Sequence, residues 1–129
     1  MLTLNEYLMG RESQYPIDDD MRINALHLLS KVNELLEEFY KANPKAKKRI
    51  ITSGYRPAAI NAKIGGAKKS NHMLCLAVDL SDVDCLLSKW ITVDILKKYD
   101  LYMENKVKTP TWVHLQLPAP KSGNRVFNP

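Results

Sequence analysis

The chain has 129 residues, a length that fits one domain and leaves no room for a second independent core. Apolar residues make up 45% of the sequence and charged residues 26%, as in an ordinary globular domain. The net charge of +5 is compatible with an anionic partner or simply with a solvated basic surface.

The sequence lacks the features of an exported, membrane-spanning or disulfide-bonded protein. No apolar run approaches the roughly 20 residues that a bilayer crossing needs, so we expect no membrane insertion. Residues 1–20 contain neither a basic leader followed by an apolar stretch nor a small-residue cleavage site, so we expect synthesis in a cytoplasm without a signal peptide. Cys75 and Cys85 are too few for a disulfide framework and are expected to be reduced.

The first third of the chain predicts one long helix. Residues 1–20 are expected to form a loosely structured or short-helix lead-in, which ends in an acidic run suited to a helix N-terminus. Apolar residues then recur at helical spacing from Met21 to Ala42, and Asn43-Pro44 ends the helix. The members of this apolar stripe are Ala25, Leu28, Leu29, Val32, Leu35, Leu36, Phe39 and Tyr40. His27 falls on the opposite, solvated face.

The rest of the chain predicts short strands separated by helical insertions. The expected strands are Arg49–Ser53, Leu76–Ser81, Leu101–Glu104 and Thr111–Leu117. The expected helical segments are Ala58–Ile64 and Asp82–Lys98, the second with a break near Trp90. Residues 118–129 form a tail with little predictable structure. We therefore predict a single α+β domain, with a small, mainly antiparallel sheet and flanking helices.

Alternation along the strands places three polar side chains on the faces opposite the apolar ones. Leu76, Val78 and Leu80 share one face of their strand, so Asp79 lies on the other. The same reasoning puts Glu104 and His114 on the polar faces of their strands. An antiparallel sheet with one solvated face alternates in the same way, so this pattern alone does not decide whether the face carries a site.

His72 adds a second imidazole, seven residues before Asp79 in a loop that can fold back over the strand. Two histidines and one aspartate leave a coordination position open, as in a catalytic zinc centre. A further carboxylate must then carry the proton, and Glu104 is the candidate. A packed His114 and an Asp79 that caps the following helix remain alternatives at this point.

Two other classes of protein, an iron oxygenase and a nucleic-acid-binding protein, fit the sequence less well. Two histidines and one carboxylate also bind ferrous iron, but the chain shows no run of many short strands able to form an oxygenase barrel. The lysine clusters around Lys47 and Lys68 are not interleaved with aromatic residues at stacking spacing, so we expect no nucleic-acid partner.

Three stretches taken together resemble a known family: SGYRP (53–57), SNHMLCLAVD (70–79) and TWVHLQ (111–116). They are similar, in this order, to motifs of the zinc D-alanyl-D-alanine carboxypeptidase and L-alanyl-D-glutamate endolysin family, whose fold is shared with the hedgehog signalling domain. The resemblance implies that His72, Asp79 and His114 bind zinc. It also implies that Arg56, Ser70 and Trp112 serve substrate binding and support the site.

Two departures from the family pattern concern the site. Cys75 stands where the family has glycine, which leaves open whether its thiol alters the pocket or reaches the metal. The interval 105–113 between Glu104 and His114 is longer than usual, so a turn over 106–110 must bring the two strands together if Glu104 is the catalytic acid and base.

The resemblance and the composition together imply a function. The expected protein is a phage-type lytic enzyme that hydrolyses peptidoglycan stem peptides as a monomer at the cell wall, where its net charge of +5 favours contact with an anionic envelope. An L-alanyl-D-glutamate endopeptidase is favoured over a D-alanyl-D-alanine carboxypeptidase by analogy with phage relatives. The alternative is a catalytically silent member of the same fold that serves as a phage structural or wall-binding module.

Overall fold

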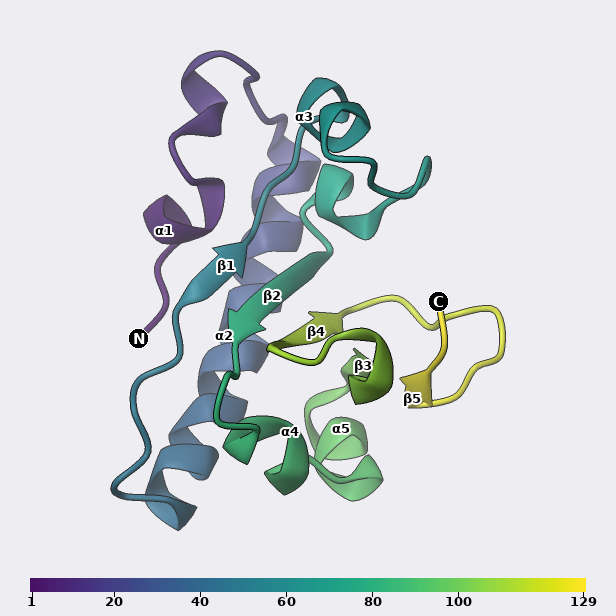
Figure 1. Ribbon diagram of the computed structural model, residues 1–129. Helices are drawn as coiled ribbons and strands as arrows, with labels where there is room; N and C mark the ends of the chain where they lie inside the picture. Colours follow the sequence, from purple (N-terminus) through teal and green to yellow (C-terminus); the bar gives the residue numbers. More distant parts are fainter.

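A sheet of five strands forms the centre of the computed structural model, which describes residues 1–129 (Figure 1). The strands are β1 (Ile51–Ser53), β2 (Ala77–Ser81), β3 (Tyr102–Glu104), β4 (Trp112–Gln116) and β5 (Val126–Phe127). Their order across the sheet is β1-β2-β4-β3-β5, and every neighbouring pair is antiparallel except β3 and β5. This mainly antiparallel sheet with its helices confirms the predicted α+β class.

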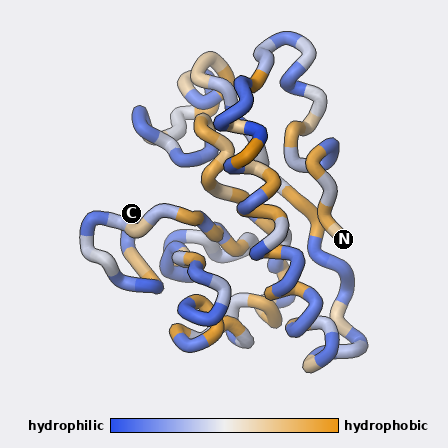
Figure 2. The backbone as a smooth tube through the Cα atoms, turned by 180° about the vertical axis from the view of Figure 1, so that it is seen from behind, coloured by the Kyte–Doolittle hydropathy of each residue, from blue (hydrophilic) through white to orange (hydrophobic).

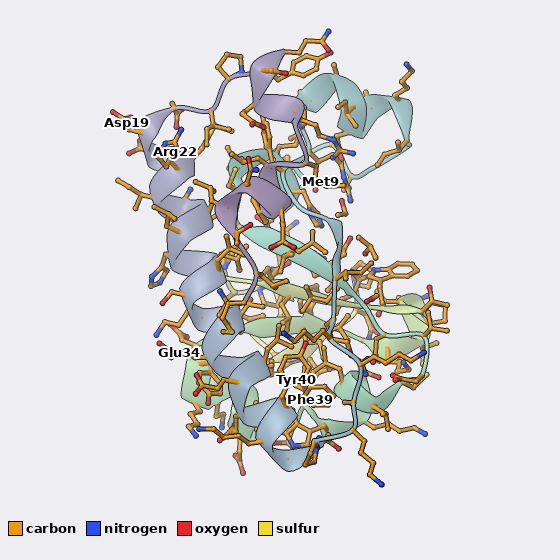
Figure 3. The ribbon with its side chains drawn as sticks, turned by 90° about the vertical axis from the view of Figure 1, so that its left-hand side faces the viewer. Met9, Asp19, Arg22, Glu34, Phe39 and Tyr40 are labelled. Carbon is orange, nitrogen blue, oxygen red and sulfur yellow. The ribbon has the colours of Figure 1, made fainter.

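Helix α2 (Asp19–Ala42) is the long helix that the apolar stripe predicts, and it packs behind the sheet in Figure 1. Asp18 caps its N-terminus by accepting a hydrogen bond from the backbone N–H of Met21 at 2.8 Å. Seven of the eight stripe residues are buried, and Tyr40 is half-buried. Apolar and polar residues alternate along its turns in the view from behind (Figure 2). The outer face carries Asp19, Arg22 and Glu34, which project away from the sheet (Figure 3).

The lead-in contains the short helix that was one of its two expected forms. In α1 (Leu4–Leu8), the Thr3 hydroxyl accepts from the Glu6 amide while the Glu6 carboxylate accepts from the Thr3 amide. Tyr7 on this helix is fully buried, and its hydroxyl donates to the carbonyl of Ala77 at 2.7 Å. The short 3-10 helix η1 (Arg11–Ser13) follows. The lead-in is thus tied directly to β2, the strand that carries Asp79.

Five shorter helices complete the chain. The α-helices are α3 (Ala58–Lys63), α4 (Leu86–Trp90) and α5 (Val93–Tyr99), and the 3-10 helices are η2 (Asn71–Leu74) and η3 (Lys106–Lys108). The break predicted near Trp90 separates α4 from α5, because Thr92 starts a new helix by capping the amide of Ile95. None of the helices combines the length and the apolar character that a bilayer crossing requires.

The tail differs from its expected lack of structure, because two of its residues form β5. The backbone N–H of Met103 donates to Arg125 O at 2.8 Å, and that of Asn105 donates to Phe127 O at 2.7 Å. The Arg125 guanidinium also stacks over the Tyr102 ring, 4.3 Å from its centroid. These contacts return residues 125–127 to the edge of the sheet beside Glu104.

Asp82, rather than Asp79, caps the helix that follows β2. Its two carboxylate oxygens accept from the amides of Leu87 and Ser88, both at 3.0 Å. The buried carboxylate also lies 3.5 Å from Arg49 and 3.4 Å from Lys106. The alternative that Asp79 serves as this cap is therefore wrong, and the Asp79 side chain is free for another role.

We expect Asp82→Ala to lower the free energy of unfolding by about 3 kcal/mol, because it removes two capping bonds and a partner of the buried Arg49. Denaturant unfolding followed by circular dichroism measures the change. Glu37→Ala is the control, since it breaks only an exposed ion pair with Lys41, and it should change stability by less than about 0.5 kcal/mol. Equal unfolding midpoints for the two variants would contradict this account of Asp82.

Candidate metal centre

Three side chains from three elements converge on one point of the sheet. His72 lies in η2, whose first turn is fixed by the Ser70 hydroxyl accepting from the His72 amide at 3.2 Å. Asp79 is the central residue of β2, and His114 faces it directly across the β2–β4 ladder. One potential ligand atom from each residue lies within 4.8 Å of the others, so this group could hold a metal ion.

One hydrogen bond on the far side of the His72 ring shows which of its nitrogens faces the centre. Nδ1 lies 2.9 Å from the carbonyl oxygen of Gly54, which can only accept, so Nδ1 carries the proton. Nε2 is left with its lone pair and lies 3.4 Å from Asp79 Oδ2. A side chain at Gly54 would clash with the carbonyl of Tyr7, 2.1 Å from the added Cβ, so only glycine allows this close approach.

The His114 ring contacts a partner through each of its nitrogens. Nδ1 lies 2.8 Å from Asp79 Oδ1, and Nε2 lies 2.9 Å from Gln116 Oε1. Burial lowers the pKa of His114, but the hydrogen bond and charge of Asp79, with smaller contributions from Gln116 and Glu104, raise it above its usual value. Without a metal ion, His114 therefore favours the protonated form more than a free imidazole does.

Asp79 is held in its ionised form between the two imidazoles. Burial raises the pKa of its carboxyl group, but the two neighbouring imidazoles, His114 more than His72, outweigh burial and lower it well below the usual range. A buried carboxylate and two imidazole nitrogens form a donor set that suits a divalent cation such as zinc. The residues present therefore fit a catalytic metal site with an open position.

A pocket of about 350 Å³ opens over this group. It brings together all seven site residues that the sequence predicts: Arg56, Ser70, His72, Asp79, Glu104, Trp112 and His114. The Arg56 guanidinium lies 3.7 Å from Asp79 Oδ2 and donates to Asn61 and Ser53 at 3.2 and 3.0 Å. Arg56 is thus oriented by three neighbours on the wall of the pocket.

Glu104 reaches the pocket from the neighbouring strand. The β3–β4 ladder pairs Tyr102 with Gln116 and Met103 with Leu115, and this register continues to place Glu104 opposite His114. The long interval before His114 is taken up by η3 (Lys106–Lys108), in the segment where a turn is expected. A half-buried carboxylate therefore lies beside the metal group without belonging to it.

Sequence reasoning assigned no role to several other lining residues. These are Ala67, Lys69, Asn71, Gln116, Phe127 and Pro129. Gln116 could have been found, because it lies on the same strand face as His114 and two residues further on. Phe127, whose ring centroid is 6.2 Å from that of His114, could not, because only the return of the tail to β3 brings it there.

Cys75 does not belong to the group of residues that could hold a metal ion. The residue ends η2 in the left-handed conformation, with φ 61°, which explains why glycine suits this position in the related family. Its side chain belongs to the hydrophobic core. Burial, followed by the charge of Asp18, raises the pKa of the thiol to about 11.

We expect a thiol reagent such as Ellman's reagent to modify Cys85 rapidly in the native protein and Cys75 only after unfolding. Cys75 is fully buried and favours the unreactive thiol form, whereas Cys85 is partly exposed. Absorbance should therefore report about one fast thiol per chain, and Cys85→Ser should remove that phase. Rapid labelling of Cys85→Ser would show that Cys75 is accessible after all.

The Peptidase M15 family model matches residues 5–116 of the chain. The match begins in α1 and ends at Gln116, so it includes the metal group, Arg56 and Glu104, while β5 lies beyond it. No curated protein and no solved structure gives a significant match.

Proposed function

Because the chain belongs to the Peptidase M15 family, whose model matches most of its length, we propose that it is a zinc peptidase that hydrolyses the stem peptides of bacterial peptidoglycan. One observation carries the proposal: a metal-binding group and a separate carboxylate, Glu104, line the same open pocket. A metallopeptidase needs both, since the carboxylate moves protons that the ligands cannot.

The pocket residues can be given roles in peptide hydrolysis. His72, Asp79 and His114 would hold the zinc ion, which would supply a Lewis acid for the scissile carbonyl and for the attacking water. Glu104 takes up a proton from the attacking water and passes it to the nitrogen of the leaving amine. Arg56 binds a substrate carboxylate or carbonyl through its guanidinium group, and Trp112 contacts the peptide from the pocket wall.

We further propose an L-alanyl-D-glutamate endopeptidase of the phage lytic type, acting as a monomer on the cell wall. The resemblance of the three sequence motifs to endolysins supports this choice over a D-alanyl-D-alanine carboxypeptidase. The net charge of +5 favours contact with an anionic envelope.

Digestion of purified peptidoglycan by the zinc-loaded protein tests the proposal, with the released groups identified by mass spectrometry. New amino-terminal glutamate would support the endopeptidase activity, whereas free D-alanine would show that the protein is a carboxypeptidase instead. Metal analysis of the same sample separates zinc from iron. Bound zinc without any cleavage would contradict the enzyme and favour the catalytically silent wall-binding module.

A further inference from the structure

Gln116 contacts the edge of the His114 ring that faces away from Asp79. We propose that Gln116 is a positioning residue that holds the proton of the neutral His114 ring on Nε2, so that Nδ1 keeps a lone pair for the metal. The inference rests on the metal site of the proposed function and adds a residue to it. It concerns hydrogen bonds between residues of the chain itself.

The orientation of the Gln116 amide follows from its second contact. Its Nε2 donates to the carbonyl oxygen of Pro118 at 2.8 Å, and a carbonyl oxygen can only accept. The amide oxygen must therefore face His114, where it accepts from the ring Nε2 at 2.9 Å. A neutral imidazole has one N–H, so a proton on Nε2 leaves Nδ1 free.

Without this acceptor, His114 has a competing arrangement that excludes the metal. Nδ1 lies 2.8 Å from the ionised Asp79 Oδ1, so the neutral ring could place its proton there and donate to the carboxylate. That tautomer would occupy both a histidine and an aspartate ligand atom in one hydrogen bond. Gln116 opposes it by accepting from the other nitrogen.

The burial of Gln116 strengthens its influence on the tautomer of His114. The side chain is 5% exposed, so water has little access to take its place as acceptor for the ring N–H. His72 has the equivalent contact with the backbone carbonyl of Gly54, which no substitution can remove. Gln116 is therefore the side chain through which the orientation of a metal ligand can be tested.

The test compares zinc affinity in Gln116→Met, which removes the acceptor at similar length, and Gln116→Glu, which retains one. Competition with a chromophoric chelator should show a 10- to 100-fold weaker affinity for Gln116→Met. We expect Gln116→Glu to restore most of the affinity, because its carboxylate also accepts from Nε2–H. Equal zinc affinities for wild type and Gln116→Met would overturn the proposal.

Nitrogen NMR of the metal-free proteins reads the tautomer itself, at a pH where the ring is neutral. We expect the neutral His114 ring to populate the Nε2–H form in wild type and to shift towards the Nδ1–H form in Gln116→Met, where only Asp79 is left as an acceptor. The same tautomer in wild type and Gln116→Met would refute the role of Gln116, whether or not the protein binds zinc. Failure of wild type to bind zinc would refute the proposed function instead.

Asn33→Leu is the control for losing an amide side chain that makes two hydrogen bonds, here a half-buried one. Asn33 exchanges two hydrogen bonds with the backbone of Leu2 and does not line the pocket. It should lower the melting temperature but leave zinc affinity unchanged. If Asn33→Leu weakens zinc binding as much as Gln116→Met, the effect is general destabilisation and the positioning role is wrong.

Discussion

The His114→Ala protein is expected to lose stoichiometric zinc and peptidase activity together. His114 supplies one of only three ligand atoms in the group, so its removal should weaken binding by more than the roughly 10- to 100-fold that loss of a supporting contact costs. Metal content after gel filtration measures the loss directly. The rise in melting temperature on adding zinc should also disappear, because that rise reports binding to the folded state.

His27→Ala provides the control for this prediction. His27 is an exposed histidine on α2, outside the metal group. Its removal tests whether the loss of any histidine, rather than of a metal ligand, weakens zinc binding. The variant should bind zinc and cleave peptidoglycan like wild type. Wild-type zinc affinity in His114→Ala would show that the ion is held elsewhere.

The helices and strands of the fold were predictable where local sequence patterns are strong. The apolar stripe of α2 and the Asn43-Pro44 stop define that helix almost to its ends, because helical periodicity and capping act within a few residues. The four predicted strands are all present, although each is shorter than its apolar pattern. Strand β5 was missed, because two residues have no readable alternation and their pairing with β3 is set by distant contacts.

The candidate site was predictable in its residues but not in its geometry. Strand alternation put Asp79, Glu104 and His114 on polar faces, the loop spacing added His72, and the resemblance added Arg56. The sequence could not show that Asp79 and His114 are direct neighbours in the ladder, since register depends on the pairing of β2 with β4. It also could not decide whether Asp79 or Asp82 caps α4, because both precede that helix.

Glu104→Gln is expected to lower kcat by about 10²- to 10⁴-fold while leaving zinc bound. The change keeps the size of the side chain and removes its capacity to take up a proton. Glu104 lines the pocket but is not among the ligand residues, so metal content should match wild type. Initial rates of peptidoglycan solubilisation, with zinc measured in the same samples, give both quantities.

Glu37→Gln makes the same chemical change on an exposed turn of α2 and should leave the rate unchanged. Glu104→Asp adds a test of reach, because it keeps the carboxylate but withdraws it by one methylene from the strand opposite His114. Its rate should fall between those of wild type and Glu104→Gln, since proton transfer depends on the distance to the reacting atoms. Full activity in Glu104→Gln would assign the proton transfer to another group, and loss of zinc from it would make Glu104 a ligand instead.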